Sequence, residues 1–287
     1  MQLHLAARAP FELARSIDVL RRFPPCRGDY VLTDDSITAA VSVRGRALAF
    51  RLSAAGPGRL AVDLRDDLTP GEQARVAQLA GWFVSADDDL AGFYAAAAGD
   101  APAFRARVAA LHGLHQVRFL TLAEIAVYAV LMQRTPIGHA SRLKRRFLER
   151  FGSTVLVGET SLHAMPELDA LRGLDAADYH AAIGHRAKAA ALPAVVRGVA
   201  ALGEDFLRTA PHAEARAALL AIPGVGPFSA AAILVRGLGR MDDLPLDHEG
   251  FARPARELYG TAYDPRAIVR RYGRHLGYWS YYVKASP

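Results

Sequence analysis

The sequence predicts a mainly α protein with a small α+β domain at its N-terminus. Short stretches in the first 70 residues alternate apolar and polar side chains, as half-buried antiparallel strands do. From residue 100 onward the apolar residues recur at helical spacing. Two apolar helical segments also flank a turn with two glycines, at about residues 214–238. These observations divide the chain into an N-terminal α+β domain, residues 1–100, and a helical domain, residues 101–287.

The N-terminal domain is expected to be an antiparallel sheet with a few helices. Asp-Asp, Arg-Gly-Arg and Ala-Gly-Pro-Gly turns separate the alternating stretches. Pro70 suits the first turn of a helix over residues 69–83. Three aspartates at 87–89 could bind a metal, but before a helix over 90–98 a capping role is more common. The predicted strands cover residues 3–5, 30–32, 37–43, 47–52 and 60–64, and a further helix covers 11–23.

The helical domain begins with a clear helix start. Thr121 with Glu124 has the pattern of a capping box, and the helix that follows over 122–133 is apolar nearly all round, which indicates burial. Pro136 starts the next helix, which ends near residue 151. Further helices are predicted over residues 102–111, 161–166, 168–174, 175–183, 186–202 and 265–284.

Composition narrows the class of protein. An apolar share of 52% with 22% charged residues is typical of a folded chain without disorder. No run is long enough for a membrane span and the N-terminus lacks a cleavable signal, so we expect a cytoplasmic protein. The single cysteine, Cys26, excludes an internal disulfide and a cysteine-ligated iron–sulfur cluster.

The charge is distributed unevenly along the chain. Residues 1–104 carry a formal net charge of −2, whereas residues 105–287 carry +8. A basic surface in the part that holds the glycine turn favours a polyanionic partner such as nucleic acid. The alternative is a genome whose base composition favours arginine, so charge alone is weak evidence.

The segment around the glycine turn carries the strongest functional signal. A helical segment stops at Pro223-Gly224-Val225-Gly226 and a second one restarts at Phe228, which makes a helix-hairpin-helix. The first amide groups of the second helix lack partners and can bind a phosphate, unless the turn is merely a structural corner. A Gly- and Pro-containing loop then leads to Asp247, which is the cap of the next helix, a catalytic group, or both.

In this combination the chain resembles the helix-hairpin-helix base-excision DNA glycosylases, whose defining motif is the hairpin followed by Pro-x-Asp-His, here residues 245–248. The remainder resembles 3-methyladenine DNA glycosylase II in its Arg-Phe joint at 118–119, its helix ending in Gln133 and its Gly184 turn before a Lys-Ala helix. This resemblance implies a glycosylase fold of two helical subdomains behind the small α+β domain. The four-cysteine cluster of endonuclease III-like members is absent.

The resemblance also implies roles for individual residues. Asp247 matches the catalytic aspartate that stabilises an oxocarbenium-like sugar or orients the attacking water. Bifunctional lyases carry a Schiff-base lysine where this chain has Phe228, so we expect hydrolysis without strand cleavage. The residues expected to contact DNA are Gly224, Val225, Gly226, Phe228 and Ser229 of the hairpin, and Gln133, Arg134 and Thr135 of the turn that fills the gap left by a flipped base.

Arg134 is the candidate wedge residue, or else one more solvated loop arginine. The resemblance further implies a monovalent cation, Na⁺ or K⁺, on the hairpin carbonyls of Ile222, Gly224 and Val225, with no other cofactor required.

A base pocket is expected among the aromatic residues of the chain. Stacking of a cationic alkylated purine on an electron-rich ring contributes about 0.5–2 kcal/mol per ring, although aromatic residues at helical spacing more often belong to the core. The candidates are Phe11, Tyr128, Phe228, His248, Tyr278, Trp279 and Tyr282.

The sequence thus predicts a monofunctional DNA glycosylase that acts on alkylated or otherwise damaged purines. Its partner would be double-stranded DNA with a damaged base, and it would work as a monomer at the nucleoid. The alternatives are a glycosylase directed at 8-oxoguanine and a catalytically inactive DNA-binding protein that keeps the hairpin.

Overall fold

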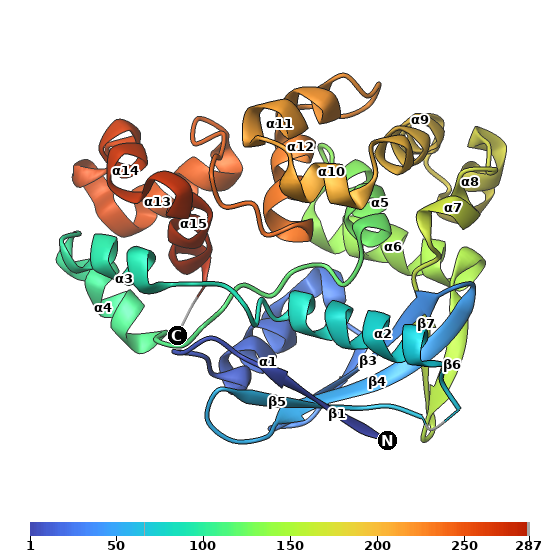
Figure 1. The fold of residues 1–287 in the computed structure, drawn as a ribbon. Coiled ribbons are helices and arrows are strands. Elements are labelled where there is room, and N and C mark those ends of the chain that lie inside the picture. Colours follow the sequence, from blue (N-terminus) through green and yellow to red (C-terminus); the bar gives the residue numbers. More distant parts are fainter. Residues whose placement is uncertain (66, 286–287) are drawn as a thin grey trace.

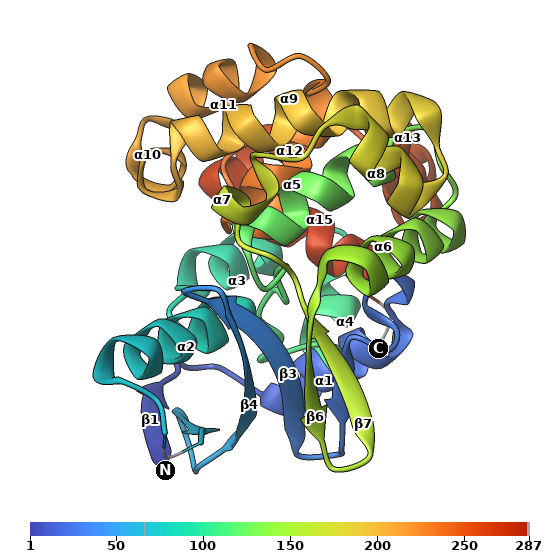
Figure 2. The same ribbon diagram turned by 90° about the vertical axis from the view of Figure 1, so that its right-hand side faces the viewer.

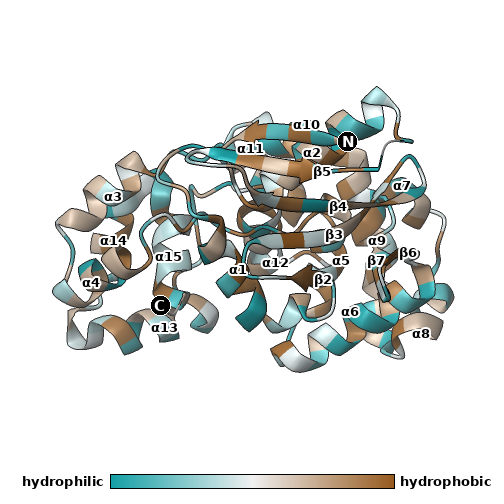
Figure 3. Cartoon of the chain, turned by 90° about the horizontal axis from the view of Figure 1, so that it is seen from below, coloured by the Kyte–Doolittle hydropathy of each residue, from teal (hydrophilic) through white to brown (hydrophobic). Residues whose placement is uncertain are grey.

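The computed structural model describes residues 1–65 and 67–285 and begins with a five-stranded antiparallel sheet (Figure 1). The strand order is β1-β5-β4-β3-β2, and Figure 3 shows the last four strands side by side. Helices α1 (Leu13–Arg22) and α2 (Pro70–Phe83) share a core with this sheet. All five predicted strands are confirmed: β1 (Gln2–Ala6), β2 (Tyr30–Leu32), β3 (Ser36–Val43), β4 (Arg46–Ala54) and β5 (Arg59–Asp63).

A second core lies around α5 (Leu122–Leu131), in which every residue is buried, as its apolar sequence predicts. Thr121 caps this helix, but the Glu124 carboxylate accepts from the amide of Leu120, so the capping box is not completed. The elements that pack around α5 are α6 (Ile137–Phe151), α7 (Leu168–Leu171), α8 (Ala176–Ile183), α9 (Arg186–Leu202), α10 (Glu204–Thr209), α11 (His212–Leu220), α12 (Pro227–Ala231) and the π-helix η2 (Ala232–Gly237).

A third core joins two distant parts of the chain. Residues of α3 (Ala91–Ala98) and α4 (Pro102–Ala110) pack on the C-terminal helices in one apolar cluster. The expected domain boundary at residue 100 is therefore corrected, because it would separate α3 from the helices that bury it. The C-terminal elements are α13 (Glu249–Tyr259), η3 (Gly260–Ala262), α14 (Pro265–Tyr272), η4 (Gly273–His275) and α15 (Leu276–Lys284), and a further short 3-10 helix, η1 (Pro24–Cys26), follows α1.

The helix predicted over residues 161–166 is wrong, because this segment is the second strand of a hairpin. Strands β6 (Ser153–Val157) and β7 (Thr160–Ala164) pair antiparallel and pack against the main sheet, as Figure 2 shows beside β3. Leu162 and Ala164 alternate with more exposed neighbours and meet Ala40 of β3 in a small apolar cluster. Their burial against the sheet favours the extended conformation over a helix.

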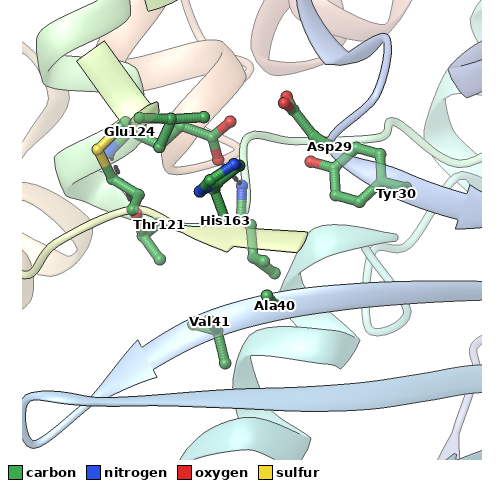
Figure 4. A pocket seen from close by; sticks show the side chains of 10 residues that line it. Asp29, Tyr30, Ala40, Val41, Thr121, Glu124 and His163 are labelled. Atoms are coloured by element: carbon green, nitrogen blue, oxygen red, sulfur yellow. Dashed lines mark hydrogen bonds between the residues drawn. The ribbon is translucent and has the colours of Figure 1, made fainter. Parts of the chain in front are cut away.

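A buried ion pair fastens the N-terminal domain to the helices. Lys144 of α6 donates to the carboxylates of Asp29, at 2.6 Å, and Glu124. Burial alone would lower the pKa of Lys144, but the two carboxylate charges raise that pKa well above its usual value. Figure 4 shows Asp29 and Glu124 with His163 beside a cavity of about 20 Å³. Its small size and internal charges indicate a structural joint between the domains.

In the part of the chain that the structure describes, every helix is too short or too polar to cross a membrane.

Candidate active site

The turn between α11 and α12 is the predicted hairpin. Gly224 has a φ of +93°, in the region that favours glycine. A Cβ at this position would lie 3.3 Å from the side chains of Ala191 and Val195 on α9, so packing also requires glycine there. Gly226 is the N-cap of α12 and has no side chain to cap it, which leaves the first amide groups of the helix without intrahelical partners. The hairpin is therefore suited to binding an anion such as a DNA phosphate.

The turn after α5 is held against the hairpin. Gln133 donates through Nε2 to the carbonyl of Gly224 at 2.7 Å and to the hydroxyl of Ser229 at 3.0 Å. The buried amine of Lys188 donates to the carbonyl of Gln133 at 2.7 Å, and Thr135 donates to the same carbonyl at 2.8 Å. Gln133, Thr135 and Ser229 are thus engaged within the protein, where they fix the turn.

Arg134 lies at the exposed tip of this turn. Its φ of +48° is unusual for a residue other than glycine and carries a cost of about 1–2 kcal/mol. The hydrogen bonds of the two flanking residues to the protein hold this conformation in place. Of the three residues predicted in the turn, Arg134 is therefore the one whose side chain is presented to solvent and to a bound duplex.

Asp247 is exposed and lies one residue before the N-cap of α13. The capping role belongs instead to His248, whose Nδ1 accepts from the amide of Gly250 at 3.0 Å. The His248 ring also stacks on Phe228 with 4.6 Å between ring centroids. Of the two roles expected for Asp247, the cap is thus filled by its neighbour, and the carboxylate is left facing the cleft.

One large cleft brings the predicted site residues together. It has a volume of about 1540 Å³ and lies between the hairpin, the turn after α5 and the start of α13. Lys188 and Arg216 add basic groups to its walls, and Asp243 adds a second carboxylate. The predicted residues that line it are Tyr128, Gln133, Arg134, Thr135, Gly224, Gly226, Phe228, Ser229, Asp247 and His248.

Four predicted base-pocket residues lie elsewhere, which corrects that part of the prediction. Phe11 packs edge-on against His115 in the N-terminal domain. The other three belong to α15, where residues Leu276 to Val283 are all buried. Because this helix is buried on every side, its spacing could not show which face meets a cavity. Each polar atom is bonded internally: Tyr278 to Asp88, Trp279 to Tyr259, and Tyr282 to the carbonyl of Leu114.

A second cavity of about 250 Å³, here called the side cavity, adjoins the cleft. Tyr128, Met132 and Phe228 line both, so a group entering from the cleft passes the Phe228 ring. The sequence pattern did not reveal most of its walls, although Tyr281 lies between the base-pocket candidates Trp279 and Tyr282. The residues missed include Gln116, Phe119, Arg236, Phe251, Tyr281 and Lys284.

The carbonyl groups expected to hold a cation take part in the hairpin turn. The Ile222 carbonyl accepts from the amide of Val225 at 3.0 Å, and the Gly224 carbonyl accepts from Gln133. A carbonyl oxygen has a second lone pair, so both remain suitable for a monovalent cation. The Val225 amide is used within the turn and is not available to a phosphate. No group of three His, Cys, Asp or Glu side chains with metal-binding spacing occurs within residues 1–65 and 67–285.

No family model matches the chain. Over 186 residues, or 64% of this chain, it is 32% identical to the "Probable bifunctional transcriptional activator/DNA repair enzyme AlkA" of Mycobacterium tuberculosis, and the match spans only 37% of that protein's length. It is also 25% identical to the DNA-3-methyladenine glycosylase of Bacillus subtilis over 230 residues. This match covers 77% of this chain and 74% of that protein.

Two solved structures share the fold across nearly the whole chain. The 3-methyladenine DNA-glycosylase from Archaeoglobus fulgidus has a TM-score of 0.77 at 20% identity and covers 99% of this chain and 97% of its own. The 8-oxoguanine glycosylase/lyase of Clostridium acetobutylicum, in complex with double-stranded DNA, has a TM-score of 0.71 at 14% identity. The match covers 99% of this chain and 96% of that one.

Proposed function

We propose a reaction for this chain, which belongs to the helix-hairpin-helix superfamily of base-excision DNA glycosylases: hydrolysis of the N-glycosidic bond of a damaged purine in duplex DNA. The observation that supports it best is that Asp247 lines the same cleft as the hairpin turn and Phe228. A protein that only bound DNA would use the hairpin but would have no need of a carboxylate at this place.

Each step has a residue suited to it. The amide groups at the start of α12 bind a backbone phosphate, and Arg134 enters the space that the flipped nucleotide leaves. As the bond to the base breaks, positive charge develops on the sugar, and the Asp247 carboxylate stabilises it. Water then adds to the sugar, with Asp247 placed to orient it or take its proton.

The arrangement of amines favours hydrolysis over a lyase reaction. Phe228 occupies the position at which lyases of this superfamily carry their lysine, and a phenyl ring cannot form a Schiff base. Lys188 does line the cleft, but it is buried and donates to the carbonyls of Val130 and Gln133. We therefore expect an abasic product with an intact strand.

The wider setting follows from the same reaction. The protein would act as a monomer on double-stranded DNA at the nucleoid in the cytoplasm. A monovalent cation on the carbonyls of Ile222, Gly224 and Val225 would support the hairpin when phosphate binds. Two alternatives remain distinct: action on 8-oxoguanine, and DNA binding without catalysis.

The test uses duplexes that carry one 3-methyladenine, 7-methylguanine, hypoxanthine or 8-oxoguanine. We expect the wild type to release at least one of these bases without cutting the strand before alkali treatment. The substitution Asp247→Asn keeps the shape of the side chain and removes its charge, so release should fall by about 100-fold or more while duplex binding persists.

The matched control is Asp243→Asn, which removes a carboxylate from the same cleft. We expect it to change release only slightly. A wild type that releases no base, or an Asp247→Asn variant with full activity, would show that the assignment is wrong.

A further inference from the structure

The side cavity has an unusual balance of charge. Its walls are mostly aromatic and aliphatic, and they include the basic side chains of Arg236 and Lys284. No Asp or Glu is among the described residues that line it. The Arg236 guanidinium lies 5.2 Å from the ring centroids of both Phe23 and Tyr281, and the Lys284 amine lies 3.9 Å from that of Phe251. The cationic groups are thus held against the same rings that a base would meet.

Burial and the charge of Arg236 lower the pKa of Lys284 to about 7, so a substantial fraction of these amines is protonated at neutral pH. Solvent still reaches Lys284, which weakens its field but does not remove it.

The second unusual feature of the side cavity is the side chain of Gln116. Its side chain is fully buried in the wall of the side cavity, and neither its amide oxygen nor its amide nitrogen has a hydrogen-bond partner among the described residues. Buried polar atoms are nearly always paired, so unpaired ones beside a cavity point to a ligand that completes them.

The main chain at Gln116 is fixed. Ser85 donates through its hydroxyl to the Gln116 carbonyl at 2.6 Å, and the next amide, of Val117, donates to the Tyr281 hydroxyl at 3.1 Å. The side-chain amide is therefore held at a defined place with an acceptor and a donor next to each other, which is the arrangement that reads the edge of a base.

We infer that the side cavity receives the extruded base, that Gln116 binds the edge of this base, and that the cavity selects neutral bases in preference to cationic alkylated purines. This inference rests on the proposed function and names its substrate class. Hypoxanthine has N1–H beside O6, which Gln116 can bind in a bidentate manner, and its carbonyl oxygen faces a cavity that carries positive charge. A methylated adenine cation also offers a donor beside an acceptor, N6–H₂ beside N1, but Arg236 and Lys284 repel its charge.

The charge of the cavity thus opposes the effect expected from aromatic stacking alone. A ring attracts a cationic base by about 0.5–2 kcal/mol, but the rings here already contact the protein's own cations. Within the proposed substrate class, neutral damaged purines are therefore favoured over cationic alkylated purines.

The experiment measures single-turnover release from two duplexes that differ only in the lesion, hypoxanthine or 3-methyladenine. We expect the wild type to release hypoxanthine at least 10-fold faster. Lys284→Met and Arg236→Met should each reduce this ratio about 3-fold or more by speeding the release of 3-methyladenine. Gln116→Leu should slow the release of both bases about 5-fold or more, because each offers an edge that the amide can bind. Lys284 is the last residue of α15, so its replacement does not disturb the core. This variant therefore keeps the test informative if the other variants misfold.

The matched control is Arg65→Met, which removes an exposed cation of the N-terminal domain and should leave the ratio unchanged. If the wild type releases 3-methyladenine as fast as hypoxanthine, or if the Lys284 and Arg236 variants keep the wild-type ratio, the inference is overturned and the proposed function stands. If none of the four bases used to test the proposed function is released, both fail.

Discussion

Replacing Gln116 by Leu should make the free protein more stable while it impairs base release. The wild-type amide is fully buried and its two polar atoms have no partner among the described residues. An unsatisfied buried polar group costs about 1–3 kcal/mol, and leucine has a similar size without that cost. We therefore expect the free energy of unfolding to rise by about 1–3 kcal/mol, which for a chain of this length corresponds to a rise in Tm of about 2–6 °C.

The same substitution removes a bidentate base contact worth about 1–3 kcal/mol, so hypoxanthine release should slow by about 5- to 150-fold. Tm would be measured by calorimetry on the free protein and release on the matching duplex. The control is Gln73→Leu, because Gln73 does donate, to the Leu68 carbonyl at 2.7 Å, and its loss should lower stability by about 0.5–1.5 kcal/mol.

The reasoning is refuted if Gln116→Leu lowers Tm as the control does, since its amide would then have partners. It is equally refuted if hypoxanthine release is unchanged.

Three further predictions concern the rest of the molecule. Lys144→Met leaves the buried carboxylate of Glu124 and the half-buried carboxylate of Asp29 uncompensated and should cost about 3–5 kcal/mol of unfolding free energy in a denaturant titration. Gly224→Ala forces a side chain into a φ of +93° and against α9, so duplex affinity measured by fluorescence anisotropy should fall equally for damaged and undamaged DNA. Between pH 6 and 8 the preference for hypoxanthine over 3-methyladenine should decline, because the Lys284 amine, whose pKa is about 7, is charged below that pH and neutral above it. Lys284→Met should abolish this pH dependence. The other charged groups around this amine are Arg236 in the side cavity and, in a neighbouring cavity of about 260 Å³ that Lys284 also lines, Arg15, Asp18 and Arg22.

Local patterns predicted the sheet and the helix-hairpin-helix well. The five strands follow period-two alternation, and their burial on one or both faces enforces it. The hairpin and Asp247 lie within one continuous stretch, so spacing alone places them near each other. The β6–β7 hairpin was missed because its five-residue strands are half polar and acquire their apolar contacts only from the distant strand β3.

The walls of the side cavity could not be found from spacing. They come from segments around residues 116–119, 236, 251 and 281–284, which only tertiary packing brings together. Gln116 also resembles an ordinary polar residue in a joint until its burial is known. The expected roles of Tyr278 and Trp279 failed for a related reason, since a helix buried on all sides shows no preferred face.

The π-helix that follows the hairpin links the phosphate-binding turn to the wall of the side cavity. Segment η2 continues α12 directly, and π-helical turns leave backbone groups free for other partners. The Arg236 carbonyl in η2 accepts from the amide of Phe119 at 2.8 Å. This hydrogen bond links the helix to the irregular segment that carries Gln116. Arg236 and Phe119 both line the side cavity. The hairpin and the wall of the side cavity are therefore joined by one continuous helical segment and one backbone hydrogen bond.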